Sequence, residues 1–176
     1  QLVRRCSFPT GINRFGVEQF DGASRSIDYK IFADKANNMI VTIDGPAGAG
    51  KSTIARNLAA TLGFRFLDTG AMYRAITLGA IRKEIEFDNQ ASLIAYAQKA
   101  TIRWDQDKLL LDGGDVTEQI RSPIVTDSIR RIADIAEIRT ALSDQQRRIA
   151  AGDNIVTEGR DQGTEVFPEA ECKLFL

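Results

Sequence analysis

The chain has 176 residues, the length of one domain or of one domain with an appendage. Hydrophobic residues make up 43% and charged residues 27%, which is a globular composition and excludes a chain disordered throughout. The net charge of −1 argues against a dedicated nucleic-acid binder, and the absence of histidine excludes any mechanism or metal site that needs an imidazole.

Cysteine content and hydrophobic runs indicate the compartment. Cys6 and Cys172 are the only cysteines, and two cysteines this far apart predict neither a disulfide framework nor a zinc site. We therefore expect reduced thiols and a cytoplasmic protein. No apolar run approaches the ~18 residues that cross a bilayer, so we expect no membrane partner.

Both ends of the chain are unusual. Residues 1–38 lack sustained hydrophobic periodicity, and we expect a flexible N-terminal extension there. The chain begins at Gln1 instead of Met and stops at Leu176, inside an apolar run that predicts a buried strand. A buried parallel strand normally continues into a crossover connection. We expect a fragment cut within the fold, with strand 173–176 exposed and prone to aggregation for lack of a neighbour.

The regular pattern starts at Met39. Residues 39–43 are a β-branched run that ends at Asp44 and predicts a strand. A helix is expected from Ser52 to the C-cap residue Gly63, and a second strand over 64–67. The expected apolar stripe of this helix is Ile54, Leu58 and Leu62.

Strands and helices then alternate, which predicts an α/β fold with a parallel sheet. The later elements are helices over 70–84 and 89–100, a hairpin of 101–104 and 109–112, a helix that starts at Pro123, a helix ended by Gly152, and strands over 154–157 and 173–176. The residues expected to face the core are Met72, Ile76 and Ala80, then Ile124, Ile129, Ile132 and Ile135, and last Ile138, Leu142, Gln145 and Ile149.

The strongest motif is G-P-A-G-A-G-K-S, from Gly45 to Ser52, which matches the phosphate-binding loop G-x-x-x-x-G-K-[ST]. It follows an expected strand and opens an expected helix, as that loop does. Its glycines let backbone N–H groups turn inward around an anion, and the helix adds its positive end. Lys51 is expected to contact the β- and γ-phosphates of a nucleoside triphosphate, and the Ser52 hydroxyl to bind Mg²⁺. No N-K-x-D motif for guanine occurs, which disfavours a GTPase.

A second anion site is indicated by arginines, whose planar guanidinium matches phosphate in bidentate fashion. Between Lys108 and Lys173 there are seven arginines and no lysine. Arg74 and Arg139 lie off or at the edge of the expected core faces, and Arg160 follows an expected strand. Carboxyl ends of parallel strands are where α/β proteins bind ligands. The side chains that end the strands are Asp44, Asp68, Thr69 and Glu158.

Four motifs resemble the bacterial cytidylate (CMP) kinases: I-D-G-P-A-G-A-G-K-S-T, L-D-T-G-A-M-Y-R, L-D-G-G-D-V-T-E-Q-I-R-S and E-G-R-D-Q-G-T-E-V-F-P. The resemblance covers about residues 39–176. It implies a P-loop nucleoside monophosphate kinase fold, truncated at its C-terminus. Residues 39–176 would form an incomplete core, residues 69–150 the acceptor-binding region, and the lid and C-terminal elements would be absent. The implied reaction is ATP-dependent phosphorylation of CMP or dCMP with Mg²⁺.

The resemblance also implies residue roles. The ATP site would comprise Gly45, Pro46, Ala47, Gly48, Ala49, Gly50, Lys51, Ser52 and Thr53. The CMP site would comprise Thr69, Tyr73, Arg74, Arg139, Arg160 and Asp161, with Lys51, Arg74 and Arg160 acting in catalysis. Arg139 and Asp161 would recognise cytosine, which chemistry supports: the exocyclic amine donates to a carboxylate, and the ring nitrogen and carbonyl accept from a guanidinium. Arg121 would organise the acceptor region.

Three positions depart from the family pattern. Where the family has a serine that helps to recognise the pyrimidine, this chain has Arg130. Where the family usually has apolar residues, it has Gln162 and Glu165. The alternatives are another P-loop small-molecule kinase or ATPase, and a non-catalytic nucleotide-binding module. We expect a monomer that binds small molecules and no nucleic acid, and a fragment that turns over little without lid arginines.

Overall fold

The computed structural model describes residues 3–6, 39–105 and 107–176. Of the expected extension over residues 1–38, strand β1 (Val3–Cys6) is described. Residues 1–2, 7–38 and 106 lie outside the described residues, so the flexibility of the extension stays a prediction.

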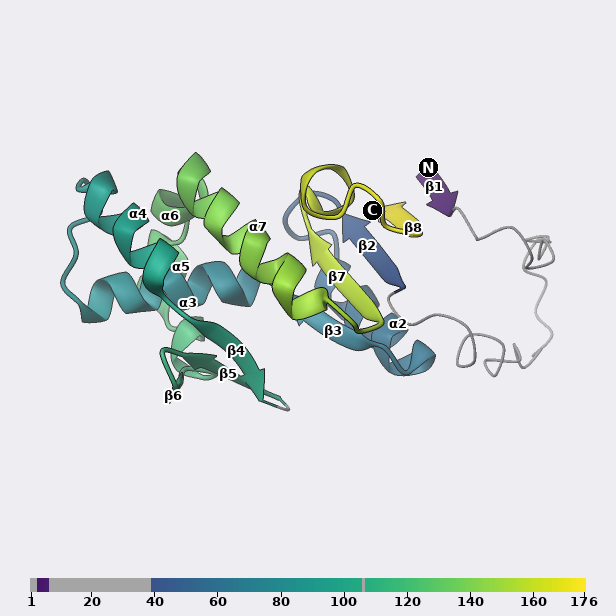
Figure 1. Ribbon diagram of the computed structural model, residues 1–176, viewed down its shortest axis with the longest axis horizontal. Coiled ribbons are helices and arrows are strands. Elements are labelled where there is room, and N and C mark those ends of the chain that lie inside the picture. Colours follow the sequence, from purple (N-terminus) through teal and green to yellow (C-terminus); the bar gives the residue numbers. More distant parts are fainter. Residues whose placement is uncertain (1–2, 7–38, 106) are drawn as a thin grey trace.

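The main sheet has five strands in the order β1-β8-β2-β7-β3, and its last four strands run parallel to one another (Figure 1). These four are β8 (Cys172–Phe175), β2 (Ile40–Asp44), β7 (Ile155–Gly159) and β3 (Arg65–Asp68). The expected α/β fold with a parallel sheet is therefore confirmed. In the register of β2 with β7, Asp44 pairs with Gly159, so both strands end at the same edge.

Strand β8 has neighbours on both sides. It pairs parallel with β2, and β1 pairs antiparallel with its outer edge, with Val3 opposite Phe175 and Cys6 opposite Cys172. The prediction of an unpaired edge at residues 173–176 is wrong, because a segment from the other end of the chain provides the ladder. Cys172 is disulfide-bonded, so the expectation of reduced thiols is also wrong.

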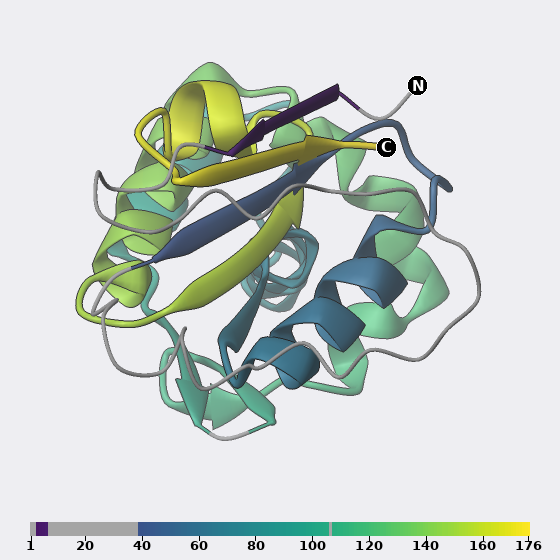
Figure 2. The same ribbon diagram turned by 90° about the vertical axis from the view of Figure 1, so that its right-hand side faces the viewer.

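Helix α2 (Lys51–Leu62) covers one face of the sheet, whereas α7 (Ala136–Ala150) and η2 (Gln162–Val166) lie on the other (Figure 2). Gly63 ends α2 in a left-handed conformation, as predicted. The expected stripe of α2 is only partly correct. Ile54 is 44% exposed, and the buried face is formed by Ala55 and Ala59. Small side chains allow this helix to pack closely on the strands.

The region expected to bind the acceptor, residues 69–150, consists of helices around α3 (Thr69–Arg82) and a small second sheet. Met72, Ile76 and Ala80 of α3 are fully buried, which confirms that stripe. Helix α4 (Gln90–Lys99) packs on α7. The expected hairpin is present and continues into a third strand, giving β4 (Ile102–Asp105), β5 (Lys108–Leu111) and β6 (Gly114–Asp115).

The segment after η1 (Gln119–Arg121) is divided into two short helices, α5 (Pro123–Ser128) and α6 (Arg130–Ala133). Ile129, which joins them, has right-handed helical backbone angles, and the buried face contains Val125 and Ile132 instead of Ile124. Ile132 and Ile135 are buried as predicted, but Ile124 is 58% exposed. The prediction for Ile124 is therefore wrong. In the described part of the chain, no helix is long and apolar enough to cross a membrane.

Candidate functional site

The loop between β2 and α2 has the backbone conformation of an anion site. Gly45, Gly48 and Gly50 have φ values of 151°, 83° and 79°, which L side chains rarely adopt. Lys51 is buried, and its Nζ donates to Pro46 O at 2.8 Å, so the ammonium group lies against the loop. Helix α2 begins at this lysine and directs its positive end to the loop. The loop can hold a phosphate group.

Ser52, Glu158 and Thr69 connect the loop with the neighbouring strand ends. Ser52 Oγ donates to Glu158 Oε1 at 2.7 Å, and Thr69 Oγ1 donates to the backbone O of Glu158 at 2.7 Å. Glu158 is 8% exposed and lies near the end of β7, which is flanked by β2 and β3. The structure thus brings the carboxyl ends of three strands together, as the sequence predicts.

The pair of Ser52 and Glu158 offers oxygen ligands of the kind that Mg²⁺ prefers. Mg²⁺ usually takes one or two protein oxygens and completes its octahedron with water and substrate phosphates. Among the described residues, no cluster of three or more His, Cys, Asp or Glu side chains could hold a metal ion by itself. The residues present therefore fit a cation that is shared with a bound phosphate group.

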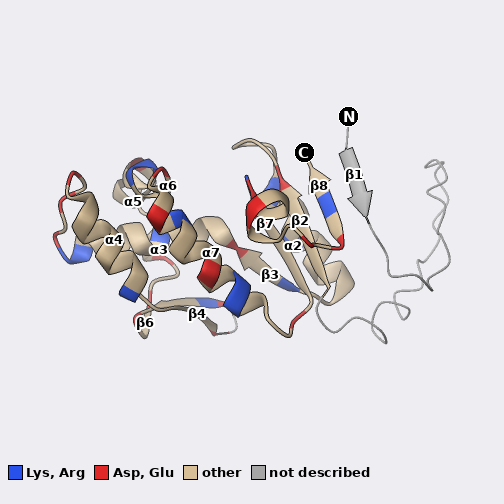
Figure 3. Cartoon of the chain, turned by 45° about the horizontal axis from the view of Figure 1, so that its top comes forward, with Lys and Arg blue, Asp and Glu red and all other residues tan. Residues whose placement is uncertain are grey.

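A second cluster lies where α7 meets the turn after β7. That turn carries basic and acidic residues side by side (Figure 3). Arg139 Nη2 of α7 donates to Asp161 Oδ2 at 2.5 Å and to Glu165 Oε2 at 3.2 Å. The hydrogen bond that Arg139 donates to Asp161 is the main cause of a raised pKa of Arg139. The structure therefore brings together the two residues expected to recognise cytosine.

Tyr73 of α3 belongs to the same cluster. Burial raises the pKa of Tyr73 to about 12; the negative charge of Asp161 acts in the same direction, whereas Arg139 opposes it. The phenol is therefore neutral at physiological pH and can both donate and accept a hydrogen bond.

The other two expected arginines differ in their surroundings. Arg74 is half-buried, and its Nη1 donates to Thr126 Oγ1 at 2.8 Å and to Ile120 O at 3.4 Å, so its partners belong to η1 and α5. Arg160 is exposed and forms no hydrogen bond or ion pair within the described part of the chain. It follows Gly159, which pairs with Asp44 at the start of the phosphate loop.

Two carboxylates lie at strand ends beside the expected site residues, although the sequence assigned them no role. Glu158 accepts from Ser52, and Asp44 accepts two backbone N–H groups from the turn that follows Arg160 and Asp161. Their position at strand ends was the available signal, but their partners lie far away in the sequence. Only the tertiary structure shows these contacts.

A strand of a parallel sheet leads through a glycine-rich loop into a helix, and Arg160 follows the neighbouring strand at the same sheet edge. These features define the class of P-loop folds, in which the glycine-rich loop binds phosphate. The family model for cytidylate kinase matches residues 41–176. The chain belongs to the cytidylate kinase family.

Individual relatives agree. The chain is 59% identical over 138 residues to the cytidylate kinase of Rhodopirellula baltica, covering 78% of this chain and 60% of the relative. It is 48% identical over 136 residues to the cytidylate kinase of Caldanaerobacter subterraneus subsp. tengcongensis, covering 77% and 61%. A bifunctional pantoate ligase/cytidylate kinase of Nostoc sp. is 44% identical over 162 residues, covering 88% and 30%. The chain thus spans about three fifths of the length of the first two relatives.

Proposed function

We propose that this chain forms the nucleotide-binding part of an enzyme that transfers a phosphoryl group from ATP to CMP or dCMP. The observation that carries the proposal is the register of β2 with β7, which puts the phosphate loop and the Arg160–Asp161 turn at one sheet edge. A donor and an acceptor can therefore lie side by side. Membership of the cytidylate kinase family supports this choice of nucleotides.

Residues 45–53 would bind the ATP phosphates. The backbone N–H groups of the loop surround the anion, and Lys51 exchanges Pro46 O for oxygens of the β- and γ-phosphates. Ser52 and Glu158 would hold Mg²⁺, which neutralises phosphate charge when bound. Because the loop is held in this conformation before the ligand arrives, little reorganisation is needed on binding.

Thr69, Tyr73, Arg74, Arg139, Arg160 and Asp161 would bind the acceptor nucleotide. The pairing between Arg139 and Asp161 is available to cytosine, which presents acceptors to the guanidinium and an amine to the carboxylate. The exposed guanidinium of Arg160 can contact the acceptor phosphate, and Arg74 can do so by giving up Thr126.

In the reaction, a phosphate oxygen of CMP attacks the γ-phosphorus of ATP. The bond from the γ-phosphorus to the β–γ bridging oxygen breaks, which leaves ADP and CDP. The acceptor phosphate is ionised at neutral pH, so no general base is required. The work of Lys51, Arg74 and Arg160 is to align both phosphates and to neutralise charge in a loose transition state.

The test measures CMP binding by calorimetry and CDP plus ADP formation from ATP, Mg²⁺ and either CMP, dCMP or UMP. We expect CMP to bind and to stimulate ADP formation. Arg139→Ala should raise the Kd for CMP by about tenfold or more, because a charged hydrogen bond is worth about 1.5–3 kcal/mol. Arg148→Ala, an exposed arginine of the same helix, is the matched control and should change the Kd less than twofold.

Other outcomes would support different functions. ADP formation that is equal with and without CMP, dCMP or UMP would indicate an ATPase. ATP binding without any transfer, in a chain extended to the full length of its relatives as well, would indicate a non-catalytic module. The monomeric state and the cytoplasmic location stay predictions. Nucleotide substrates support that location, whereas a disulfide at Cys172 is rare in the reducing cytosol and weighs against it.

A further inference from the structure

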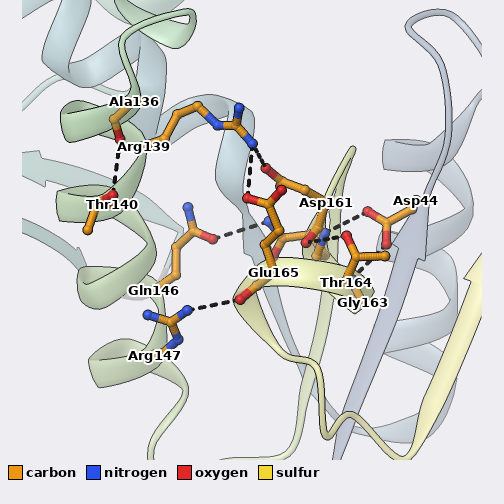
Figure 4. Close-up of polar contacts among 11 residues, drawn as sticks. Asp44, Ala136, Arg139, Thr140, Gln146, Arg147, Asp161, Gly163, Thr164 and Glu165 are labelled. Carbon is orange, nitrogen blue, oxygen red and sulfur yellow. Dashed lines mark hydrogen bonds and ion pairs between the residues drawn. The ribbon is translucent and has the colours of Figure 1, made fainter.

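Asp44 connects the two halves of the proposed site. It is the last residue of β2, it directly precedes Gly45 of the phosphate loop, and it is 7% exposed. Its carboxylate accepts two hydrogen bonds, from Gln162 N to Oδ1 and from Gly163 N to Oδ2, each 2.8 Å long (Figure 4). Both oxygens of one buried side chain are thus bound to a segment 118 and 119 residues away in the sequence.

These two N–H groups belong to the π-helical turn η2, which begins directly after Arg160 and Asp161. Within the turn, Glu165 N and Val166 N donate to Asp161 O at 2.9 and 3.2 Å. The backbone of Asp161 is therefore part of the hydrogen-bonded unit that Asp44 holds. A displacement of this unit would move Asp161 and, with it, Arg160.

The turn also lies unusually close to β2. A Cβ added at Gly163 would lie 2.7 Å from Thr42 Oγ1 and 3.2 Å from Asp44 Oδ2. Any side chain at this position would push the turn away from the strand. The absence of a side chain at Gly163 and the two hydrogen bonds to Asp44 are independent features that keep the turn in this place.

We propose that Asp44 is a positioning residue, which holds the Arg160–Asp161 turn in register with the phosphate loop and so couples binding at the two anion sites. The identity of the two ligands rests on the proposed function. In this role Asp44 contacts neither nucleotide and acts through the backbone of Gln162 and Gly163. A carboxylate suits this role, because a charged acceptor forms shorter and stronger hydrogen bonds than a neutral one. Two bonds to one group also fix the orientation of the turn.

The test compares Asp44→Asn with Asp68→Asn. Asp68 also ends a strand of this sheet and accepts a backbone N–H, from Ala71 at 2.9 Å, but it caps α3 and does not contact the turn. For Asp44→Asn we expect the Kd for CMP to rise tenfold or more and the tightening of CMP binding by ATP to be lost. The Kd for ATP alone should change less than threefold. Asp68→Asn should leave both constants within twofold of the unsubstituted chain.

Amide hydrogen exchange provides a readout that does not depend on nucleotides. Phe167 N donates to Gln162 O at 2.7 Å and has no bond to Asp44, so its exchange reports whether the turn as a whole has loosened. We expect tenfold or faster exchange at Phe167 in Asp44→Asn and no change in Asp68→Asn. Gly163→Ala displaces the turn without altering a charge, and it should reproduce both effects if Asp44→Asn does not fold.

Unchanged CMP binding together with unchanged exchange at Phe167, in either folded variant, overturns the positioning role. A chain that does not bind CMP at all contradicts the proposed function instead. In that case the exchange rates at Phe167 alone decide whether Asp44 positions the turn.

Discussion

Tyr73, which lies in the cluster with Arg139 and Asp161, makes the free energy of unfolding depend measurably on pH. Burial is the main reason why the pKa of Tyr73 rises from its ordinary value of 10.0 to about 12 in the folded chain. As the pH rises past 10, the unfolded chain loses the phenolic proton first and is stabilised. The contribution of Tyr73 to stability is therefore complete below pH 10 and is lost between pH 10 and 12.

Tyr73→Phe tests this shift. We expect the difference in free energy of unfolding between the unsubstituted chain and the variant to be constant up to about pH 9. It should then fall by about 2–3 kcal/mol at pH 12, at 1.36 kcal/mol per unit of pKa. Urea unfolding of both proteins at several pH values measures it, and all other titrating groups cancel in the difference. A difference that stays flat to pH 12 would show that Tyr73 is exposed to solvent.

Single residues were predictable where their role depends on local conformation. The positions of Lys51 and Ser52 beside the loop could be predicted from spacing, because the glycines around them dictate how the loop folds. Asp44 and Glu158 could not be assigned, since their partners are more than 100 residues away. Glu165 is an intermediate case: the sequence shows an unusual carboxylate, and the structure shows that it competes for Arg139.

At the scale of elements, the clearest difference between expectation and structure concerns the residues after Pro123. We expect Ile132→Ala to lower the free energy of unfolding by about 2–5 kcal/mol, because the side chain is fully buried in α6 and its removal leaves a cavity. Ile124→Ala is the matched control and should cost less than about 0.5 kcal/mol, since Ile124 is 58% exposed. Denaturant titration measures both. A large effect at Ile124 would restore the single helical face that the sequence predicts.

The elements themselves were largely predictable. Alternation of strands and helices, glycine at the end of α2 and proline at the start of α5 are local signals, and the structure confirms each. Which face of an element is buried depends on what packs against it. The sheet therefore buries the alanine face of α2 and leaves Ile54, from the expected stripe, exposed. In the same way, β1 pairs with the outer edge of β8, which no pattern in residues 1–38 indicated.

At the scale of the whole molecule, the two proposed anion sites belong to different structural units. The donor site is made by one loop and the helix that follows it, whereas the acceptor site combines α3, α7 and the turn after β7. A net charge of −1 leaves no general attraction for polyanions, so the binding of negative ligands depends on these local arrangements. Each ligand should therefore stabilise the fold through its own set of contacts.

Lys51→Ala tests whether the two sites are separate, because each bound ligand should raise the Tm on its own. A ligand present at 100 times its Kd stabilises the folded state by about 2.7 kcal/mol, which corresponds to a rise of several degrees in Tm for a chain of this size. We expect Mg²⁺ with ATP, and CMP alone, each to raise the Tm of the unsubstituted chain. Lys51→Ala should abolish the rise with ATP and keep the rise with CMP, because Lys51 contacts the phosphate loop and no residue of the acceptor cluster. Lys99→Ala, at an exposed lysine at the end of α4, is the control and should keep both rises. Loss of both rises in a folded Lys51→Ala variant would contradict separate sites and indicate that one pocket binds both nucleotides.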